Sequence, residues 1–271
     1  MRIMTIDRRL LLAVIGFSLC SMLLAFQDND FKIFYAAGVA ARSGVSPYTI
    51  PGFYNPVSVL VYFVPISLLP EPAAFRITIF ISALVYCVVL YHFSHRQLIS
   101  TSLALLSPLL LYNIFYTNVE WLCLLGTIVN PLAGFLLAWF KPQVGIILSI
   151  VLLLVIFRRN GWQVAVLMCL AQALILGISF ALGLSWGIAV PVWGNYSLFP
   201  WGLLLAVPLA VFALIKTDRA SALACGPFLS PYVAIQSWVA LLPLVVRRRW
   251  TISMLTIAGW VLVVIYLLQP H

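Results

Sequence analysis

The chain has 271 residues, of which 64% are hydrophobic and only 8% are charged. Soluble domains carry about 25% charged residues, and a soluble surface needs charge to stay dispersed, so this composition excludes a soluble globular protein. The formal net charge is +9, and the basic residues that produce it lie mostly at the ends of apolar runs. This position is typical of membrane helices rather than of nucleic-acid binding. We therefore predict an all-α, polytopic integral membrane protein, with residues 1–271 forming one transmembrane domain that binds no nucleic acid.

Apolar runs recur along the whole chain at lengths that suit membrane helices. A helix that crosses about 30 Å of hydrocarbon needs about 20 residues. Five runs reach or approach this length, namely 10–26, 75–93, 163–184, 199–215 and 250–268. Six further candidates are shorter or interrupted, namely 57–69, 100–116, 121–140, 143–157, 220–230 and 233–246. Together these runs predict about nine to eleven membrane helices.

Positive charges predict the orientation of these helices, because Lys and Arg favour the cytoplasmic side. Arg2, Arg8 and Arg9 precede the first run, and no small-x-small cleavage site follows it, so we interpret this run as a retained signal anchor. We expect a multi-pass protein of the cytoplasmic (plasma) membrane with a cytoplasmic N-terminus. Alternating spans then place Arg158, Arg159, Lys216, Arg219 and 247–249 inside, and 27–55, Lys141, 185–198 and 230–232 outside.

One stretch leaves two threadings open. Simple alternation places Arg96 outside, against the positive-inside tendency, and places Glu120 inside. If 57–69 and 121–140 are instead re-entrant hairpins, Arg96 lies inside and Glu120 outside. Both segments are short or interrupted enough to allow this.

The segment 27–55 follows the first apolar run and carries the first candidate site. Phe31, Phe34, Tyr35 and Gly38 share one face of a helix, a pattern typical of a helix that lies in the membrane interface. We therefore expect 27–55 to form interfacial helices on the outer face rather than a span.

Asp28 and Asp30 stand at the start of this segment, in Gln27-Asp28-Asn29-Asp30-Phe31. They could be solvated, or Asp30 could cap the helix that follows it. They could also act as a general base or as a pair that binds a divalent metal. A second metal candidate, His92 with His95, lacks a third ligand. We expect no cofactor, with a divalent metal at Asp28 and Asp30 as the open alternative.

Lys141 is a lone cation between two predicted outer span ends. A buried cation needs a counter-ion, which the phosphate of a substrate would supply. The alternative is that Lys141 extends its ammonium group to the interface, as lysines commonly do.

Several short motifs resemble a known family in their order, spacing and predicted side of the membrane. The motifs are Asp30-Phe31, Tyr35-Ala36-Ala37, Gly44, Pro47-Tyr48, Tyr54-Asn55-Pro56, Leu69-Pro70, Thr117-Asn118-Val119-Glu120-Trp121, Lys141-Pro142-Gln143 and Leu229-Ser230-Pro231-Tyr232. They are similar to elements of the class C glycosyltransferases, in particular the polyprenol-phosphate-mannose-dependent mannosyltransferases of glycosyltransferase family 87. The chain departs from that pattern at Asn55 and Thr117, and in the short distance between Glu120 and Lys141.

The resemblance implies inverting transfer of a hexose such as mannose from a polyprenyl-phosphate donor to an unknown acceptor on the outer face. Asp30 would be the general base and Asp28 its nearest substitute. The implied substrate-binding residues are Lys141, Gln143, Tyr35, Tyr48, Tyr54, Asn55, Asn118, Glu120, Ser230 and Tyr232. The departures leave a second interpretation open, in which the chain is a non-catalytic membrane subunit of a larger complex. In both cases membrane lipid surrounds the protein.

Overall fold

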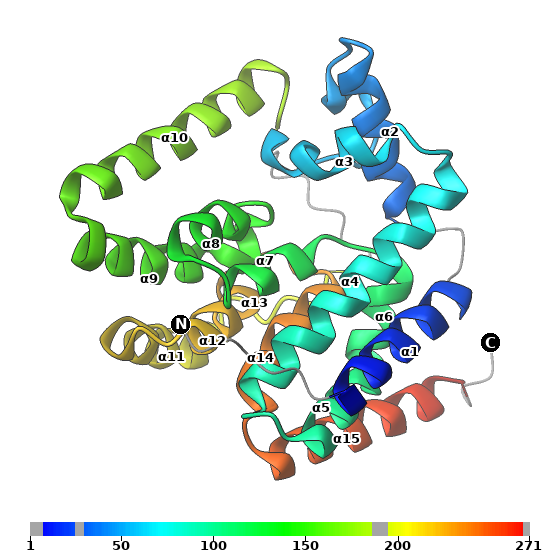
Figure 1. Cartoon of the computed structure of the whole chain (residues 1–271). Helices are drawn as coiled ribbons and strands as arrows, with labels where there is room; N and C mark the ends of the chain where they lie inside the picture. Colours follow the sequence, from blue (N-terminus) through cyan, green and yellow to red (C-terminus); the bar gives the residue numbers. More distant parts are fainter. Residues whose placement is uncertain (1–7, 25–29, 186–194, 268–271) are drawn as a thin grey trace.

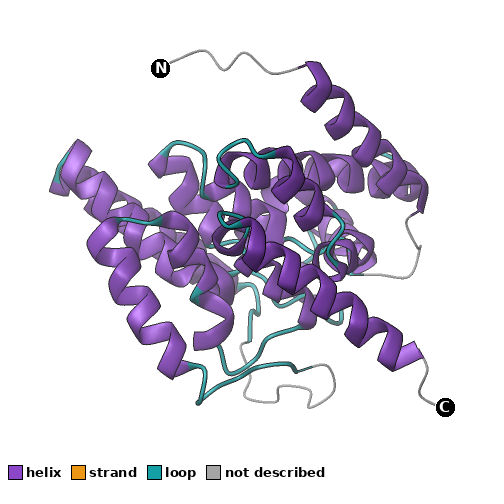
Figure 2. Cartoon of the chain, turned by 90° about the horizontal axis from the view of Figure 1, so that it is seen from below, coloured by secondary structure: helices purple, strands orange, loops and turns teal. Residues whose placement is uncertain are grey.

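The computed structural model describes residues 8–24, 30–185 and 195–267, and every regular element among them is helical (Figures 1 and 2). The all-α prediction is therefore confirmed for this part of the chain. Asp28 lies outside the described residues, so its predicted role has no structural counterpart here.

Three helices of the described residues are long and apolar enough to cross a membrane: α4 (Glu71–Phe93), α9 (Pro142–Asn160) and α10 (Trp162–Ala181). A fourth crossing results if α5 (Leu98–Leu105) and α6 (Pro108–Tyr116), which are bent by 56° at their junction, count as one span. This is fewer than the nine to eleven expected. Shorter apolar helices are α1 (Arg8–Leu24), α11 (Leu203–Lys216) and α15 (Arg249–Leu267).

The remaining apolar runs are shorter because turns and prolines divide them. Run 57–69 forms η2 (Val57–Val59) and α3 (Leu60–Ile66), and run 121–140 forms α7 (Glu120–Gly126) and α8 (Pro131–Ala138). Run 220–230 forms α12 (Arg219–Ala224) and α13 (Gly226–Leu229), and run 233–246 forms η3 (Ile235–Leu241) and α14 (Leu242–Val245). Helices of about eight residues are only about 12 Å long, so none of these crosses about 30 Å of hydrocarbon alone.

Helices α7 and α8 form a tight hairpin, which explains how residues 120 and 141 come together. Gly126 and Gly134 face each other across it, since a Cβ on Gly126 would lie 3.0 Å from the Gly134 carbonyl oxygen. At its tip, Arg219 Nη1 donates to the carbonyl oxygens of Thr127 (3.1 Å) and Val129 (2.9 Å). The start of α7 and the end of α8 therefore lie together at the end of the hairpin away from this tip.

Three arginines from distant parts of the chain lie near the C-terminal end of α4. Arg96, Arg219 and Arg247 all lie close enough to His92 to interact with its charge. The Arg247 guanidinium also stands 5.4 Å from the centre of the Phe93 ring. Arg96 therefore lies with Arg219 and Arg247, whereas Glu120 lies with Lys141.

Helix α2 (Phe31–Arg42) packs on α3 through the face that the sequence predicted to be apolar. Phe31, Phe34 and Gly38 are buried there. A Cβ on Gly38 would lie 2.5 Å from the carbonyl oxygen of Phe63, so only glycine permits this approach. At 12 residues, about 18 Å, α2 is too short to cross a membrane. The loop that follows contains the short helix η1 (Pro47–Thr49).

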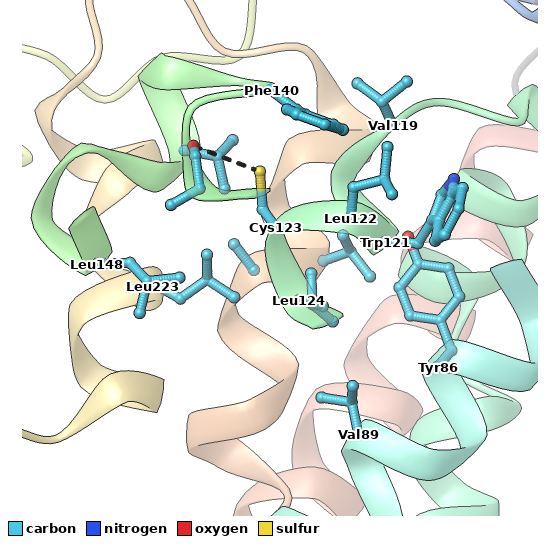
Figure 3. Close-up of a cluster of buried hydrophobic side chains, with 14 of the residues drawn as sticks. Tyr86, Val89, Val119, Trp121, Leu122, Cys123, Leu124, Phe140, Leu148 and Leu223 are labelled. Carbon is cyan, nitrogen blue, oxygen red and sulfur yellow. Dashed lines mark hydrogen bonds between the residues drawn. The ribbon is translucent and has the colours of Figure 1, made fainter. Parts of the chain in front are cut away.

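The core that supports the site brings together α4, α7, α9 and α12. Figure 3 shows Tyr86 and Val89 of α4 close to Trp121 and Leu124 of α7, with Leu148 and Leu223 on the other side. All are buried. Such packing holds α7, and therefore its first residue Glu120, in a fixed position.

Candidate functional site

The carboxylate of Asp30 is held by two amides from distant parts of the chain. Asn118 Nδ2 and Gln236 Nε2 both donate to Asp30 Oδ2, at 2.5 and 3.1 Å. Asn118 lies just before α7 and Gln236 lies in η3, while Asp30 directly precedes α2. The carboxylate is half-buried, so it stands at the edge of the packed core.

The structure excludes the helix-capping alternative for the Asp30 side chain. Its carboxylate makes no capping hydrogen bond to α2, and its backbone already has helical angles (φ −58°, ψ −21°). A side chain that caps a helix normally needs an extended backbone at that residue to reach the free N–H groups.

A buried ion pair lies behind Asp30. Lys141 donates to Glu120 Oε1, and the Ser237 hydroxyl donates to the same oxygen at 2.8 Å. Asn113 Nδ2 donates to Glu120 Oε2 at 3.1 Å. Glu120 is fully buried and Lys141 is 5% exposed. Opposite charges buried together need such additional hydrogen bonds to offset the cost of leaving water.

The two parts of the site are joined through Asn118. Lys141 Nζ donates to Asn118 Oδ1 at 3.1 Å, while Asn118 Nδ2 donates to Asp30. Because an ammonium group can only donate, Lys141 determines which end of the amide faces Asp30. The network therefore runs from Glu120 through Lys141 and Asn118 to the half-buried carboxylate.

This network corrects the expectation for Lys141. The sequence indicated a lone cation that either binds a phosphate or reaches the interface. In the structure its counter-ion is Glu120, and its ammonium group is buried rather than extended to the surface. The electrostatic reason for a phosphate at Lys141 therefore disappears.

The surroundings of Asp30 favour the protonated form of its carboxyl group. Burial raises the pKa of Asp30 above its ordinary value of 3.8, and the negative charge of Glu120 acts in the same direction. The charge of Lys141 and the hydrogen bonds from Asn118 and Gln236 lower the pKa, but burial dominates. A carboxylate with a raised pKa is a stronger base than a solvated one.

Three of the residues predicted to bind substrate hydrogen-bond to backbone carbonyl groups in the segments that precede and follow α3 and in the segment before α9. Tyr35 donates to the carbonyl oxygen of Leu69 at 2.9 Å. Tyr48 donates to the carbonyl oxygen of Asn55 at 3.0 Å, and Asn55 Nδ2 donates to the carbonyl oxygen of Phe140 at 2.9 Å. Asn55 thus fixes the loop before α3 to Phe140, the residue that precedes Lys141 of the buried ion pair.

The other predicted binding residues lie at varying distances from this network. Tyr54 is 61% exposed, and Gln143 is half-buried in the first turn of α9. The Ser230 hydroxyl donates to the carbonyl oxygen of Tyr232, so these two residues stabilise their own turn. Among the described residues, none of these four side chains hydrogen-bonds to Asp30.

Sequence reasoning missed four residues of the network, all within predicted apolar runs. Gln236 and Ser237 lie in 233–246, and Asn113 in 100–116. The Tyr86 hydroxyl of α4 donates to Asn113 Oδ1. Isolated polar residues inside apolar runs are costly unless they are paired, and this signal could have identified Asn113 and Gln236.

The described residues contain no group of three or more His, Cys, Asp or Glu side chains placed to hold a metal ion. Comparisons with models of protein families, with curated proteins and with solved structures found no match to this chain.

Proposed function

We propose that this chain is an integral membrane glycosyltransferase that moves a hexose from a polyprenyl-phosphate donor to an acceptor hydroxyl. The observation that carries the proposal is the half-buried carboxylate of Asp30, held through one oxygen by two amides and supported by a buried ion pair. The motifs that resemble glycosyltransferase family 87 include Asp30, Asn118, Glu120 and Lys141, and these four side chains lie in one hydrogen-bonded network.

The proposed reaction needs one base, which is Asp30. Its carboxylate takes the proton of the acceptor hydroxyl while that oxygen bonds to the anomeric carbon of the sugar. The bond between the anomeric carbon and the phosphate oxygen breaks, and the lipid phosphate leaves with the electron pair. Direct displacement inverts the anomeric configuration. Since both hydrogen bonds from described residues end on Oδ2, Oδ1 is the oxygen that would face the acceptor.

Lys141 acts in this proposal as a positioning residue rather than as the phosphate partner. It fixes the Asn118 amide so that Nδ2 points to Asp30. Glu120 in turn pairs with Lys141 and holds its buried ammonium group in place. A base held in one orientation is effective because the reacting groups are already aligned.

We place the site at the outer face of the cytoplasmic membrane. Arg96, Arg219 and Arg247 gather around His92 at the C-terminal end of α4, and positive charge favours the cytoplasmic side. The N-terminus is then cytoplasmic, 27–55 lies in the outer interface, and the donor is reached from the outer leaflet.

The test is the transfer of labelled mannose from a polyprenyl-phosphate donor by purified protein in lipid nanodiscs, with a membrane extract as the source of acceptors. Asp30→Asn keeps the shape and the hydrogen-bond acceptor but removes the base, so we expect a loss of about 10²–10⁴-fold in rate. Glu71→Gln is the matched control, because Glu71 is exposed at the start of α4 and should leave the rate unchanged. The wild-type rate should also fall as the pH is lowered. The midpoint of this fall should lie above pH 3.8, because the pKa of Asp30 is raised above that value.

Two results would contradict the proposal in different ways. If Asp30→Asn turned over at the wild-type rate, Asp30 would not be the base. If folded wild-type protein transferred no hexose from any polyprenyl-phosphate donor, the chain would be better described as a non-catalytic subunit of a membrane complex.

A further inference from the structure

A small cavity lies where α1 ends and where α2 and α4 begin (Figure 1). It has a volume of about 110 Å³, whereas a single water needs only about 10–15 Å³ of such space. The cavity can therefore hold a polar group of several heavy atoms. Its lining is partly apolar and partly charged and includes Met22, Phe31, Phe75, Lys32, Glu71 and Arg76. The described residues that line it include neither Asp30 nor the two amides that hold Asp30.

The cavity combines an apolar floor with a charged rim. The rings of Phe31 and Phe75 are buried, and their centres lie 5.3 Å apart. Lys32 and Arg76 are exposed beside them. In a membrane, the first turns of a crossing helix lie near the depth of the lipid headgroups, and α4 is long and apolar enough to be such a helix. Charged groups above an apolar floor at this depth match a phospholipid, which has a phosphate above its acyl chains.

Arg76 is the lining residue that most needs a ligand. It lies five residues after the start of α4, about 7.5 Å along the helix axis. Within the described residues its guanidinium group makes no hydrogen bond or ion pair. An arginine keeps its charge, and a charge next to hydrocarbon needs a counter-ion. A guanidinium group commonly binds a phosphate through two parallel hydrogen bonds, so a lipid phosphate would supply that counter-ion.

The charges of the lining indicate how much negative charge the cavity accepts. Lys32 and Arg76 are positive and Glu71 is negative, which leaves an excess of one positive charge. A phosphodiester carries one negative charge, whereas a phosphomonoester carries close to two at pH 7. A headgroup that also bears an ammonium group has no net charge. This balance favours a phosphodiester without an ammonium group.

We propose that this cavity binds the headgroup of an anionic glycerophospholipid such as phosphatidylglycerol. Its phosphate contacts Arg76 and Lys32, and its glycerol backbone lies against Phe31 and Phe75. Its acyl chains follow the end of α1, where Leu23 is 75% exposed. The bound lipid thereby joins α1, α2 and α4. This site goes beyond the proposed function, because it takes a lipid of the surrounding membrane that is neither donor nor acceptor.

The experiment measures lipid binding by native mass spectrometry of the full-length protein in non-ionic detergent micelles, with no donor present. Dioctanoyl phosphatidylglycerol, phosphatidylethanolamine and phosphatidylcholine are titrated separately. Phosphatidylglycerol should bind several-fold more tightly than the other two, because their ammonium groups cancel the phosphate charge. Arg76→Gln and Lys32→Gln should each raise its Kd about fivefold, since one basic residue at the membrane surface contributes about this factor. Arg76→Lys should lose less affinity than Arg76→Gln, because it keeps the charge.

Arg158→Gln provides a matched control, because it removes an exposed arginine from the last turn of α9. It should bind phosphatidylglycerol as the wild type does, which separates the cavity from a general effect of net charge. The thermal unfolding midpoint shows whether each variant is folded. In the wild type this midpoint should also rise by about 5–10 °C when phosphatidylglycerol is present at about a hundredfold excess over its Kd. The rise should be smaller in Arg76→Gln at the same lipid concentration.

Several results would overturn the inference. Absence of binding, equal binding of the three lipids, or an equal loss of affinity in Arg76→Gln and Arg158→Gln would show that the cavity does not recognise an anionic headgroup. Displacement of the lipid by inorganic phosphate at the same concentration would show a site for a free anion. Tighter binding of a polyprenyl phosphate than of phosphatidylglycerol would assign the cavity to the donor lipid. Each of these results is independent of hexose transfer, which Asp30→Asn tests.

Discussion

Replacing Lys141 with methionine removes the cation that neutralises Glu120 while keeping a side chain of similar length. Glu120 is fully buried and would retain only the hydrogen bonds from Ser237 (2.8 Å) and Asn113 (3.1 Å). Removing one partner of a buried ion pair costs about 3–5 kcal/mol, because the other charge stays buried without compensation. For a chain of this size, about 1 kcal/mol lowers the unfolding midpoint by about 2–4 °C. We therefore expect Lys141→Met to unfold about 6–20 °C below the wild type.

A double-mutant cycle separates this stabilising role from phosphate binding. Glu120→Gln alone leaves Lys141 buried without its counter-ion and should also be destabilising. Combining it with Lys141→Met removes both charges, so the double variant should be more stable than either single variant by about 1–3 kcal/mol. Unfolding is followed in nanodiscs by intrinsic fluorescence. If both single variants unfolded with the wild type, and Lys141→Met only weakened donor binding, the buried-pair reasoning would be refuted.

Two further predictions concern packing and pH. Gly145→Ala should destabilise the protein by about 1–3 kcal/mol, because its Cβ would lie 1.9 Å from the carbonyl oxygen of Ala138. In the control Gly177→Ala the new Cβ meets no atom within 4 Å, so this variant should stabilise α10 by about 0.5–1 kcal/mol. The thermal unfolding of both variants measures these changes. Burial alone would raise the pKa of Asp218, but hydrogen bonds from Arg247 and from the Ser221 backbone lower it below 3.8, so its stabilising effect should be present above pH 3.8 and be lost as the pH falls through the lowered value. Unfolding of the wild type and of Asp218→Asn between pH 7 and pH 3 should therefore show the two converging at low pH, and a constant difference would contradict this.

The positions of the long helices could be predicted from the sequence. Runs 75–93, 143–157 and 163–184 became α4, α9 and α10, with ends shifted by a few residues. This works because a helix satisfies its own backbone hydrogen bonds, so a long apolar run needs no distant partner to define it. The apolar face of α2 was predictable for the same local reason.

The shorter runs were less predictable, because runs of similar apolar composition fold into different structures. Run 121–140 looked like a broken span, but the contact between Gly126 and Gly134 closes it into a hairpin. Run 100–116 bends by 56° between α5 and α6. Whether a short apolar helix crosses, bends or returns depends on what packs against it, and hydropathy does not contain that information.

The candidate site, like the fold, was predictable from the sequence only in part. The sequence by itself determined that Asp30, Glu120 and Lys141 are scarce charges in an apolar chain, and scarcity alone made them candidates. Only the tertiary structure decided that Glu120 neutralises Lys141, and that Gln236, 206 residues from Asp30, reaches its carboxylate. The physical reason is that burying a charge requires a partner in space, and the partner is chosen by how the helices pack rather than by any local pattern along the chain.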